Sequence, residues 1–336
     1  MLDYSQLEKY DPSGMHKIYD QWPQIAKDAY DSNLESVDFK NIDHIVFAGM
    51  GGSGAIGDSF ASILSKTNIH VSVVKGYLLP HTVDKNTLVV TTSVSGNTVE
   101  TLTVLDSAHK LDCNIVAFSS GGKMEEYCIK NQINYKKIES IHSPRTSFIK
   151  FLFSILNVLN SILSINKNHI FESLDELSKL QKQTCSQNLS NSNPALNLAN
   201  FISEIPLIYY PYGLESSAIR FKSSMQENAK SHAIIEDMVE ACHNGIVAWE
   251  KPSIIQPVLL RGYDDYIKTQ ERFEIIKEFF TKQNIEYREI NSVSGNILTK
   301  LITLNYLLDY TSVYRAILSE IDPTPVSSIN FIKSKI

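Results

Sequence analysis

The chain has 336 residues, of which 43% are hydrophobic and 20% charged, an ordinary balance for a soluble globular protein. This length exceeds one ordinary hydrophobic core, so two domains of similar size are expected. The formal net charge of −6 and the lack of a Lys/Arg-rich run argue against a nucleic-acid partner or an anionic membrane surface, so an anionic ligand would need a local pocket.

Three features indicate a cytoplasmic protein without a membrane span. The start of the chain lacks a basic segment followed by an apolar one, so no secretory signal is expected. The most apolar stretch, residues 148–165, carries polar residues at spacings of three and four, which is typical of a packed helix. The four cysteines lie far apart, which indicates neither a zinc site nor a disulfide framework. Cys242 adjoins His243, but a structural cysteine explains it better than a thiol nucleophile.

Strands and helices alternate from residue 44 to about Pro144. The expected strands are residues 44–49, 70–77, 86–93 and 113–120, and the expected helices are residues 54–67, 96–111 and 123–132. The strands are continuous apolar runs, as in a parallel sheet that is covered on both faces. The pattern therefore predicts a doubly wound α/β domain.

The same pattern restarts in the second half, after two long helices within residues 146–190 and an Asn-rich stretch. Strands are expected at residues 205–213, 253–262 and 285–291, and helices at 214–230, 267–284, 295–318 and 326–335. We predict an N-terminal domain over residues 1–150, a helical connection over 151–195 and a C-terminal domain over 196–336. The site is expected between the two domains, at the carboxyl ends of the strands.

The segment FAGMGGSGAIGDS, residues 47–59, has the spelling of a dinucleotide-binding turn. It reads G-x-G-x-x-G at Gly49, Gly51 and Gly54. Such a turn needs a carboxylate at the end of the second strand, but that strand ends in Lys75, and Asp58 comes too early. Ser53 stands at the expected N-cap of the next helix, where its hydroxyl and the free N–H groups suit a phosphate. The loop therefore favours another phosphate over NAD.

A second loop of the same kind, TSVSGNT at residues 92–98, lies at the end of strand 86–93. Ser93, Ser95 and Thr98 offer hydroxyls at the start of another helix. Two adjacent strand ends would then present hydroxyls and helix N-termini to a single phosphate. The alternative is an Asx-rich turn that only caps a helix. No Walker lysine follows either loop, so ATP chemistry is not indicated.

Seven blocks in order across nearly the whole chain carry a resemblance to a known family. They are AGMGGSGAIGD, SVSGNTVETL, SGGK, SPR, MQENAK, HNGIVAWE and DPTPVSSINFIK. Together they resemble the bifunctional phosphoglucose/phosphomannose isomerases, a branch of the sugar isomerase (SIS) domain proteins. The resemblance implies two SIS domains, each a doubly wound parallel sheet flanked by helices, in a homodimer with shared active sites. It also implies interconversion of glucose 6-phosphate or mannose 6-phosphate with fructose 6-phosphate, without a metal or organic cofactor.

The resemblance also assigns roles to residues that would otherwise pass as ordinary. Glu227 in QENAK looks like the base that moves a proton between C1 and C2, although on its own it reads as a solvated helix glutamate. His243 looks like the ring-opening histidine, which in the family comes from the partner subunit. The family usually reads N-H-N-E there, whereas this chain has Cys242 and Gly245 on either side of His243 and Asn244.

The remaining roles follow the same resemblance. Lys333 matches the lysine that assists ring opening, and Lys335 lies off the motif. Arg145 would steady the enediolate charge, although a simple salt bridge also explains an arginine there. Thr324 in DPTPV would shape the pocket near C1 and C2. The phosphate ligands are expected to be Gly52, Ser53, Ser93, Ser95 and Thr98.

Two other functions remain open from the sequence. The first is another SIS isomerase, which would act on a pentose or amino sugar phosphate with the same loops. The second is a non-catalytic sugar-phosphate sensor, which would keep the hydroxyl loops but have no use for Glu227.

Overall fold

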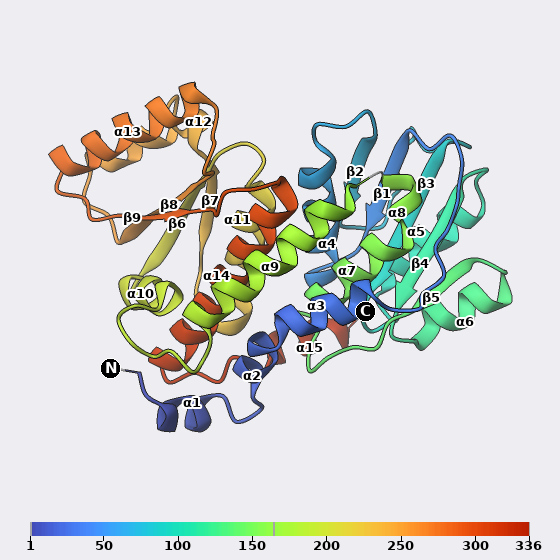
Figure 1. Ribbon diagram of the computed structural model, residues 1–336, viewed down its shortest axis with the longest axis horizontal. Coiled ribbons are helices and arrows are strands. Elements are labelled where there is room, and N and C mark those ends of the chain that lie inside the picture. The colour runs from blue at the N-terminus through green and yellow to red at the C-terminus, as the bar shows by residue number, and fades with distance from the viewer. Residues whose placement is uncertain (1, 164, 336) are drawn as a thin grey trace. The chain divides into compact units, whose positions relative to one another are not determined.

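The computed structural model describes residues 2–163 and 165–335 (Figure 1). The chain forms two compact units, which we describe separately. The N-terminal unit is Gln21–Leu174, and the C-terminal unit is Met1–Asp20 with Asp175–Ile336. The first twenty residues thus group with the second half of the chain. The domain borders expected at residues 150 and 195 stay a prediction.

The N-terminal unit is built on a parallel sheet. Within the described residues the sheet has five strands in the order β2-β1-β3-β4-β5. They are β1 His44–Ala48, β2 His70–Val74, β3 Thr87–Ser93, β4 Asn114–Ser119 and β5 Asn134–Lys137. β1 and β3 are buried along their whole length, as expected of central parallel strands.

Helices cover both faces of this sheet. They are α3 Trp22–Tyr30, α4 Gly52–Leu64, α5 Val99–His109, α6 Gly122–Lys130, α7 Phe148–Val158 and α8 Asn160–Leu163, and α9 Lys167–Thr184 runs on into the other unit. From β1 the chain moves through α4 to β2, and from β3 it moves the opposite way through α5 to β4. Since such crossovers are right-handed, α4 and α5 lie on opposite faces, and the strand order reverses between β1 and β3.

The apolar stretch predicted as a packed helix is α7. Nine of its eleven residues are buried, and α7 packs against α3 and α4 within the N-terminal unit. Two long helices were expected between residues 146 and 190; the first is interrupted after Val158 and continues as α8, and the second is α9. None of the helices in the described part of the chain is long and apolar enough to cross a membrane.

The C-terminal unit contains a second parallel sheet, with the order β7-β6-β8-β9 among the described residues. Its strands are β6 Ile205–Tyr210, β7 Ile234–Asp237, β8 Ile255–Arg261 and β9 Arg288–Asn291. Its helices are α1 Tyr4–Tyr10, α2 Met15–Asp20, α10 Pro194–Phe201, α11 Glu215–Asn228, α12 Met238–Ala241, the 3-10 helix η1 Gly245–Glu250, α13 Ile267–Lys282, α14 Ile297–Leu318 and α15 Ser327–Lys333.

Two helix layers enclose this second sheet. α14 packs against α10 and α11, and α11 contacts β6 and β7 (Figure 1). Another cluster holds Met238 of α12 and Phe273 and Phe280 of α13 against Leu207 and Leu259 of the strands. The two parallel sheets flanked by helices confirm the predicted α/β fold.

Candidate active site

The two hydroxyl-bearing loops of the N-terminal unit lie at the switch point of its sheet. One loop follows β1 and the other follows β3, and these strands are hydrogen-bonded neighbours. The Ser53 hydroxyl accepts a hydrogen bond from the backbone N–H of Val94 at 3.3 Å, which joins the two loops directly. In open α/β sheets, ligands bind in the crevice at this point. The structure therefore brings the predicted phosphate ligands of both loops together.

Hydroxyls organise the second loop. The Ser93 hydroxyl lies 2.9 Å from that of Thr98 and accepts from the Gly96 N–H at 3.1 Å. The exposed Ser95 hydroxyl accepts from the Asn97 N–H at 3.3 Å. Thr98 is the N-cap of α5, but its side chain makes no capping bond to the helix. The first-turn N–H groups of α5 are therefore not capped by this side chain, as an anion site at a helix N-terminus requires.

A third loop supports the second from the side. The Gly96 carbonyl accepts a hydrogen bond from the Met124 N–H at 2.9 Å. Gly96 has a φ of 68°, and a Cβ there would collide with the carbonyl oxygen of Gly121. Gly122, at the start of α6, would in turn meet the Asn97 side chain. The SVSGNT and SGGK loops therefore pack against each other, although they are separated in the sequence.

Arg145 lies beside the glycine loop. A Cβ on Gly52 would stand 3.0 Å from the carbonyl oxygen of Pro144 and 3.7 Å from the Cα of Arg145. The arginine itself is buried. Hydroxyl bonds hold this segment, since Thr146 and Ser147 both donate to the carbonyl of Ile141. The fold therefore places the backbone of Arg145 beside the N-terminus of α4.

A lysine stands where a dinucleotide-binding turn would need a carboxylate. Lys75, which follows β2, forms a 2.6 Å ion pair with Asp58 of α4. The position where a ribose would need a carboxylate thus carries a cation already engaged by the helix. This arrangement agrees with the choice of a phosphate over NAD for this loop.

Glu227 lies in the last turn of α11 and is half-buried. Because α11 returns from the carboxyl end of β6 to the start of β7, Glu227 lies toward the amino edge of its own sheet. For the C-terminal unit, the expectation of a site at the carboxyl ends of the strands therefore does not hold for this residue. It comes from a return helix, whereas the phosphate ligands come from loops that follow strands.

The loop that holds Thr324 is tied to Glu227. Lys230 has a φ of 54°, and its ammonium donates to the carbonyl of Glu227 at 2.6 Å and to that of Pro323 at 3.2 Å. The side chain of Asp322 accepts from the Thr324 N–H at 2.8 Å. The QENAK and DPTPV blocks are therefore neighbours in space. Sequence reasoning gave Lys230 no role, and its place inside a shared block was the only signal.

His243 and Lys333 are both exposed within the C-terminal unit. His243 follows α12, and its backbone N–H donates to the Glu240 carbonyl at 2.8 Å. Lys333 is the last residue of α15. Both side chains are open to solvent, so another surface could approach them.

Comparison with known proteins decides the family. Residues 38–155 match the SIS domain family, and residues 191–336 match the family described as the bacterial phospho-glucose isomerase C-terminal SIS domain. A bifunctional phosphoglucose/phosphomannose isomerase of Caldicellulosiruptor bescii is 33% identical over 95% of this chain and 97% of its own length. The chain belongs to the bifunctional phosphoglucose/phosphomannose isomerase family.

The two matched family models confirm the two predicted SIS domains. Two further comparisons show how widely the fold and the sequence are shared. A hypothetical protein of Thermus thermophilus shares the fold with a TM-score of 0.76 at 14% identity, over 98% of this chain and 91% of its own. A D-glucosamine-6-phosphate 4-epimerase of Sulfolobus acidocaldarius is 30% identical over 69% of this chain and 72% of its own. Proteins similar to this family member thus include one with a different named reaction.

The structure gives a steric reason for Gly245, which stands near His243 where the family usually has a glutamate. A Cβ on Gly245 would collide with the carboxylate of Glu236 from β7. Burial raises the pKa of Glu236, and the nearby charges of Glu240 and Asp237 add to the effect. A glutamate at position 245 would therefore force two carboxylates together unless Glu236 moved.

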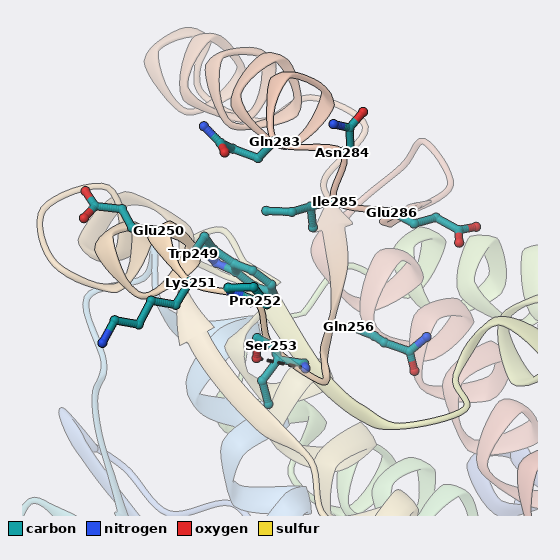
Figure 2. Close-up of a pocket in the computed structure, with 11 residues that line it drawn as sticks. Trp249, Glu250, Lys251, Pro252, Ser253, Gln256, Gln283, Asn284, Ile285 and Glu286 are labelled. Carbon is teal, nitrogen blue, oxygen red and sulfur yellow. Dashed lines mark hydrogen bonds between the residues drawn. The ribbon is translucent and has the colours of Figure 1, made fainter.

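A cavity of about 450 Å³ opens at the amino edge of the second sheet (Figure 2). Trp249, Pro252 and Ile285 form its apolar part, and the segments that lead into β8 and β9 line it. The Gln256 side chain accepts from the N–H groups of Ser203 and Glu204, so it holds the backbone. The residues that line this cavity include none of the predicted site residues.

Proposed function

We propose that this chain is an aldose–ketose isomerase that interconverts glucose 6-phosphate and mannose 6-phosphate with fructose 6-phosphate through a cis-enediol. The observation that carries the proposal is the hydrogen bond from the Val94 N–H to the Ser53 hydroxyl. It joins two hydroxyl loops and two helix N-termini at one switch point, which suits a single terminal phosphate.

The phosphate holds the substrate through the N-terminal unit. The Gly52 N–H and the hydroxyls of Ser53, Ser93, Ser95 and Thr98 donate to its oxygens. The first turns of α4 and α5 add dipoles that favour the dianion, by roughly 0.3–1 kcal/mol each. A sugar without the phosphate would lose all of these contacts.

The isomerisation moves one proton between C1 and C2. Glu227 takes the proton from one carbon and returns it to the other, and positioned proton transfer contributes roughly 10²–10⁴ in rate. Arg145 stabilises the negative charge that develops on the enediolate oxygens. The reaction oxidises one carbon and reduces its neighbour, so it requires no external oxidant or reductant.

Ring opening and specificity fall to three further residues. His243 and Lys333 exchange protons with the ring and C1 oxygens, because imidazole and ammonium groups can both donate a proton. Thr324 leaves room for either configuration at C2, which admits both the glucose and the mannose phosphate. We further propose a cytoplasmic homodimer that acts in glycolysis and gluconeogenesis, with His243 supplied to the site of the partner subunit.

A coupled assay tests this proposal. Purified wild-type protein is given glucose 6-phosphate and mannose 6-phosphate separately, and fructose 6-phosphate is followed as the product. We expect turnover of both aldoses, with a KM in the common range of about 1 μM to 1 mM. Turnover of neither aldose would reject the proposal.

The Sulfolobus relative supports one rival, an epimerase of glucosamine 6-phosphate. The rival keeps the phosphate ligands but inverts C4, so it needs no proton exchange at C2. The same preparation is therefore given glucosamine 6-phosphate and ribulose 5-phosphate, and the products are identified by NMR. Turnover of one of these compounds with no turnover of the hexose phosphates would favour the rival. Binding of sugar phosphates without any turnover would favour a sensor.

A further inference from the structure

A row of polar side chains is buried between α11 and α14. Arg220, Ser224 and Asn228 recur at every fourth residue of α11, so they share one face of that helix. They meet Asp309 and Ser312 of α14, and all five are at most 4% exposed. A face of this kind is ordinarily apolar in a helix pair, so these polar residues call for an explanation.

Direct hydrogen bonds connect this polar row. Arg220 Nε donates to Asp309 Oδ2 at 3.0 Å, and the Ser224 hydroxyl donates to Asp309 Oδ1 at 2.7 Å. Asn228 Nδ2 donates to the Ser312 hydroxyl at 2.8 Å. The Ser312 hydroxyl donates in turn to the backbone carbonyl of Asp309 at 2.6 Å. Asp309 is thus the centre of the row.

These bonds enclose the turn of α11 that carries Glu227. Ser224 lies one turn before Glu227, and Asn228 is the next residue after it. Beyond the helix end, the Lys230 ammonium binds the Glu227 carbonyl and also the Pro323 carbonyl. The backbone of Glu227 is therefore held on both sides along the helix and from the DPTPV loop.

Apolar contacts alone would not define this position so closely. A buried ion pair is costly to desolvate and often adds little net stability, but its hydrogen bonds are satisfied in only one arrangement. A slip of α11 by one residue would turn the helix by about 100° and break the bonds to Asp309 and Ser312 together. The row therefore specifies one rotation and one height of α11 against α14.

We propose that Ser224, Asn228, Asp309 and Arg220 form a positioning network for the Glu227 carboxylate. This inference rests on the proposed function, in which Glu227 moves the proton. Ser224 and Asn228 are positioning residues, because they act through the backbone of the turn that carries Glu227. A misplacement of a catalytic group by about 1 Å can cost up to about 10²-fold in rate.

A matched pair of serine variants tests the network. Ser224→Ala removes the hydroxyl that binds Asp309, and Ser186→Ala removes a hydroxyl that binds Asp20 at 2.6 Å in the same unit. The two serines are 4% and 3% exposed, so the truncations resemble each other in burial and lost bonding. We expect Ser224→Ala to lower kcat about tenfold with little change in KM, and Ser186→Ala to change kcat less than twofold. Equal kcat values in the two variants would overturn the proposal.

A second measurement separates this inference from the proposed function. Amide hydrogen exchange is followed over residues 225–229 in both serine variants. We expect faster exchange there in Ser224→Ala and wild-type exchange in Ser186→Ala. If the wild type isomerises neither hexose phosphate, the proposed function fails, and the exchange result still decides whether the network holds this turn. Unchanged exchange in Ser224→Ala would reject the network even in an active enzyme.

A double-mutant cycle with Asn228→Ala and Ser312→Ala examines the other bond of the network. If the two residues act together, the double variant loses little more kcat than Asn228→Ala alone. Independent, multiplicative losses would count against a shared role. Asn228→Leu keeps a similar volume but removes the amide that donates to Ser312. The network predicts that Asn228→Leu loses as much kcat as Asn228→Ala, whereas a merely space-filling role predicts the wild-type kcat.

Discussion

At the scale of single residues, Gly96 offers the sharpest test of the phosphate loops. Its φ is 68°, and a Cβ there would collide with the Gly121 carbonyl oxygen. We expect Gly96→Ala to raise the KM for fructose 6-phosphate at least about tenfold, because Ser93 and Thr98 lose their shared geometry. Gly76→Ala is the control, since a Cβ at Gly76 meets nothing within 4 Å. Equal KM values in the two variants would show that the loop tolerates the change.

A second residue-scale prediction concerns pH. Burial lowers the pKa of His44, and the neighbouring His70 adds to the effect. Because the pKa of His44 is lower in the folded state, the unfolded chain binds this proton more tightly than the folded chain. The contribution of neutral His44 to the free energy of unfolding is therefore fully present above about pH 6.5, the ordinary histidine pKa, and is lost as the pH falls through the lower pKa of the folded state. We expect the free energy of unfolding, measured with urea, to change less between about pH 7 and pH 5 in His44→Gln than in the wild type.

The exposed His169 on α9 supplies the control for this measurement. His169→Gln should leave the pH dependence of the wild type in place. If His169→Gln flattens the curve and His44→Gln does not, the assignment to His44 is wrong.

The sequence could predict residue types at the site but not their contacts. The spacing of hydroxyls after two apolar strands was enough to predict Ser53, Ser93 and Thr98 as neighbours. The approach of Arg145 to Gly52 depends on how a later segment returns to the sheet, which no local pattern encodes. Glu227, His243 and Lys333 read as solvated residues, and only shared motifs point to their roles, which stay predictions.

At the scale of elements, two serines on α4 allow a binding role to be distinguished from a structural one. Ser53 lies in its first turn, whereas Ser59 lies further along and its hydroxyl donates to the Ala55 carbonyl at 2.9 Å. We expect Ser53→Ala to raise the KM of both aldose phosphates about 10-fold to 150-fold, the loss of roughly one charge-assisted hydrogen bond. Ser59→Ala should leave KM unchanged. A KM raised equally by both changes would mean that the helix itself is disturbed.

The sequence analysis missed the helices α1, α2, α3, α10, α12 and η1, and the strands that it missed are two short edge strands. β5, Asn134–Lys137, reads NYKK, and β7, Ile234–Asp237, reads IIED. Their polar and charged residues break the apolar run that identifies a buried strand, because an edge strand is covered less completely. The central strands have no such exposure, and all of them were predicted.

At the scale of the whole molecule, the sequence predicted two α/β domains but assigned the first twenty residues to the N-terminal one, whereas they group with the C-terminal unit. Asp20 at the end of α2 accepts hydrogen bonds from the Ser186 hydroxyl at 2.6 Å and from the hydroxyl of Tyr310. These bonds join residues that lie far more than a hundred positions apart in the sequence, so no local pattern near the start of the chain predicts them. They explain why the N-terminal helices belong to the C-terminal unit.

The proposed homodimer makes a prediction about mixtures. Glu227→Gln and His243→Ala are each expected to be nearly inactive. If each site combines Glu227 of one protomer with His243 of its partner, half of the randomly mixed dimers are hybrids, and each hybrid has one intact site. Equal amounts, unfolded and refolded together, should then regain about a quarter of the wild-type activity. A mixture as inactive as its components would contradict a shared site.

The central claim is that Glu227 carries the proton between C1 and C2. Wild type and Glu227→Gln are incubated with glucose 6-phosphate in D₂O, and deuterium at C2 is followed by NMR. The account predicts rapid exchange in the wild type, and in Glu227→Gln exchange slowed by at least about 10²–10⁴ while the sugar phosphate still binds. Exchange at the wild-type rate in Glu227→Gln would show that another group is the base.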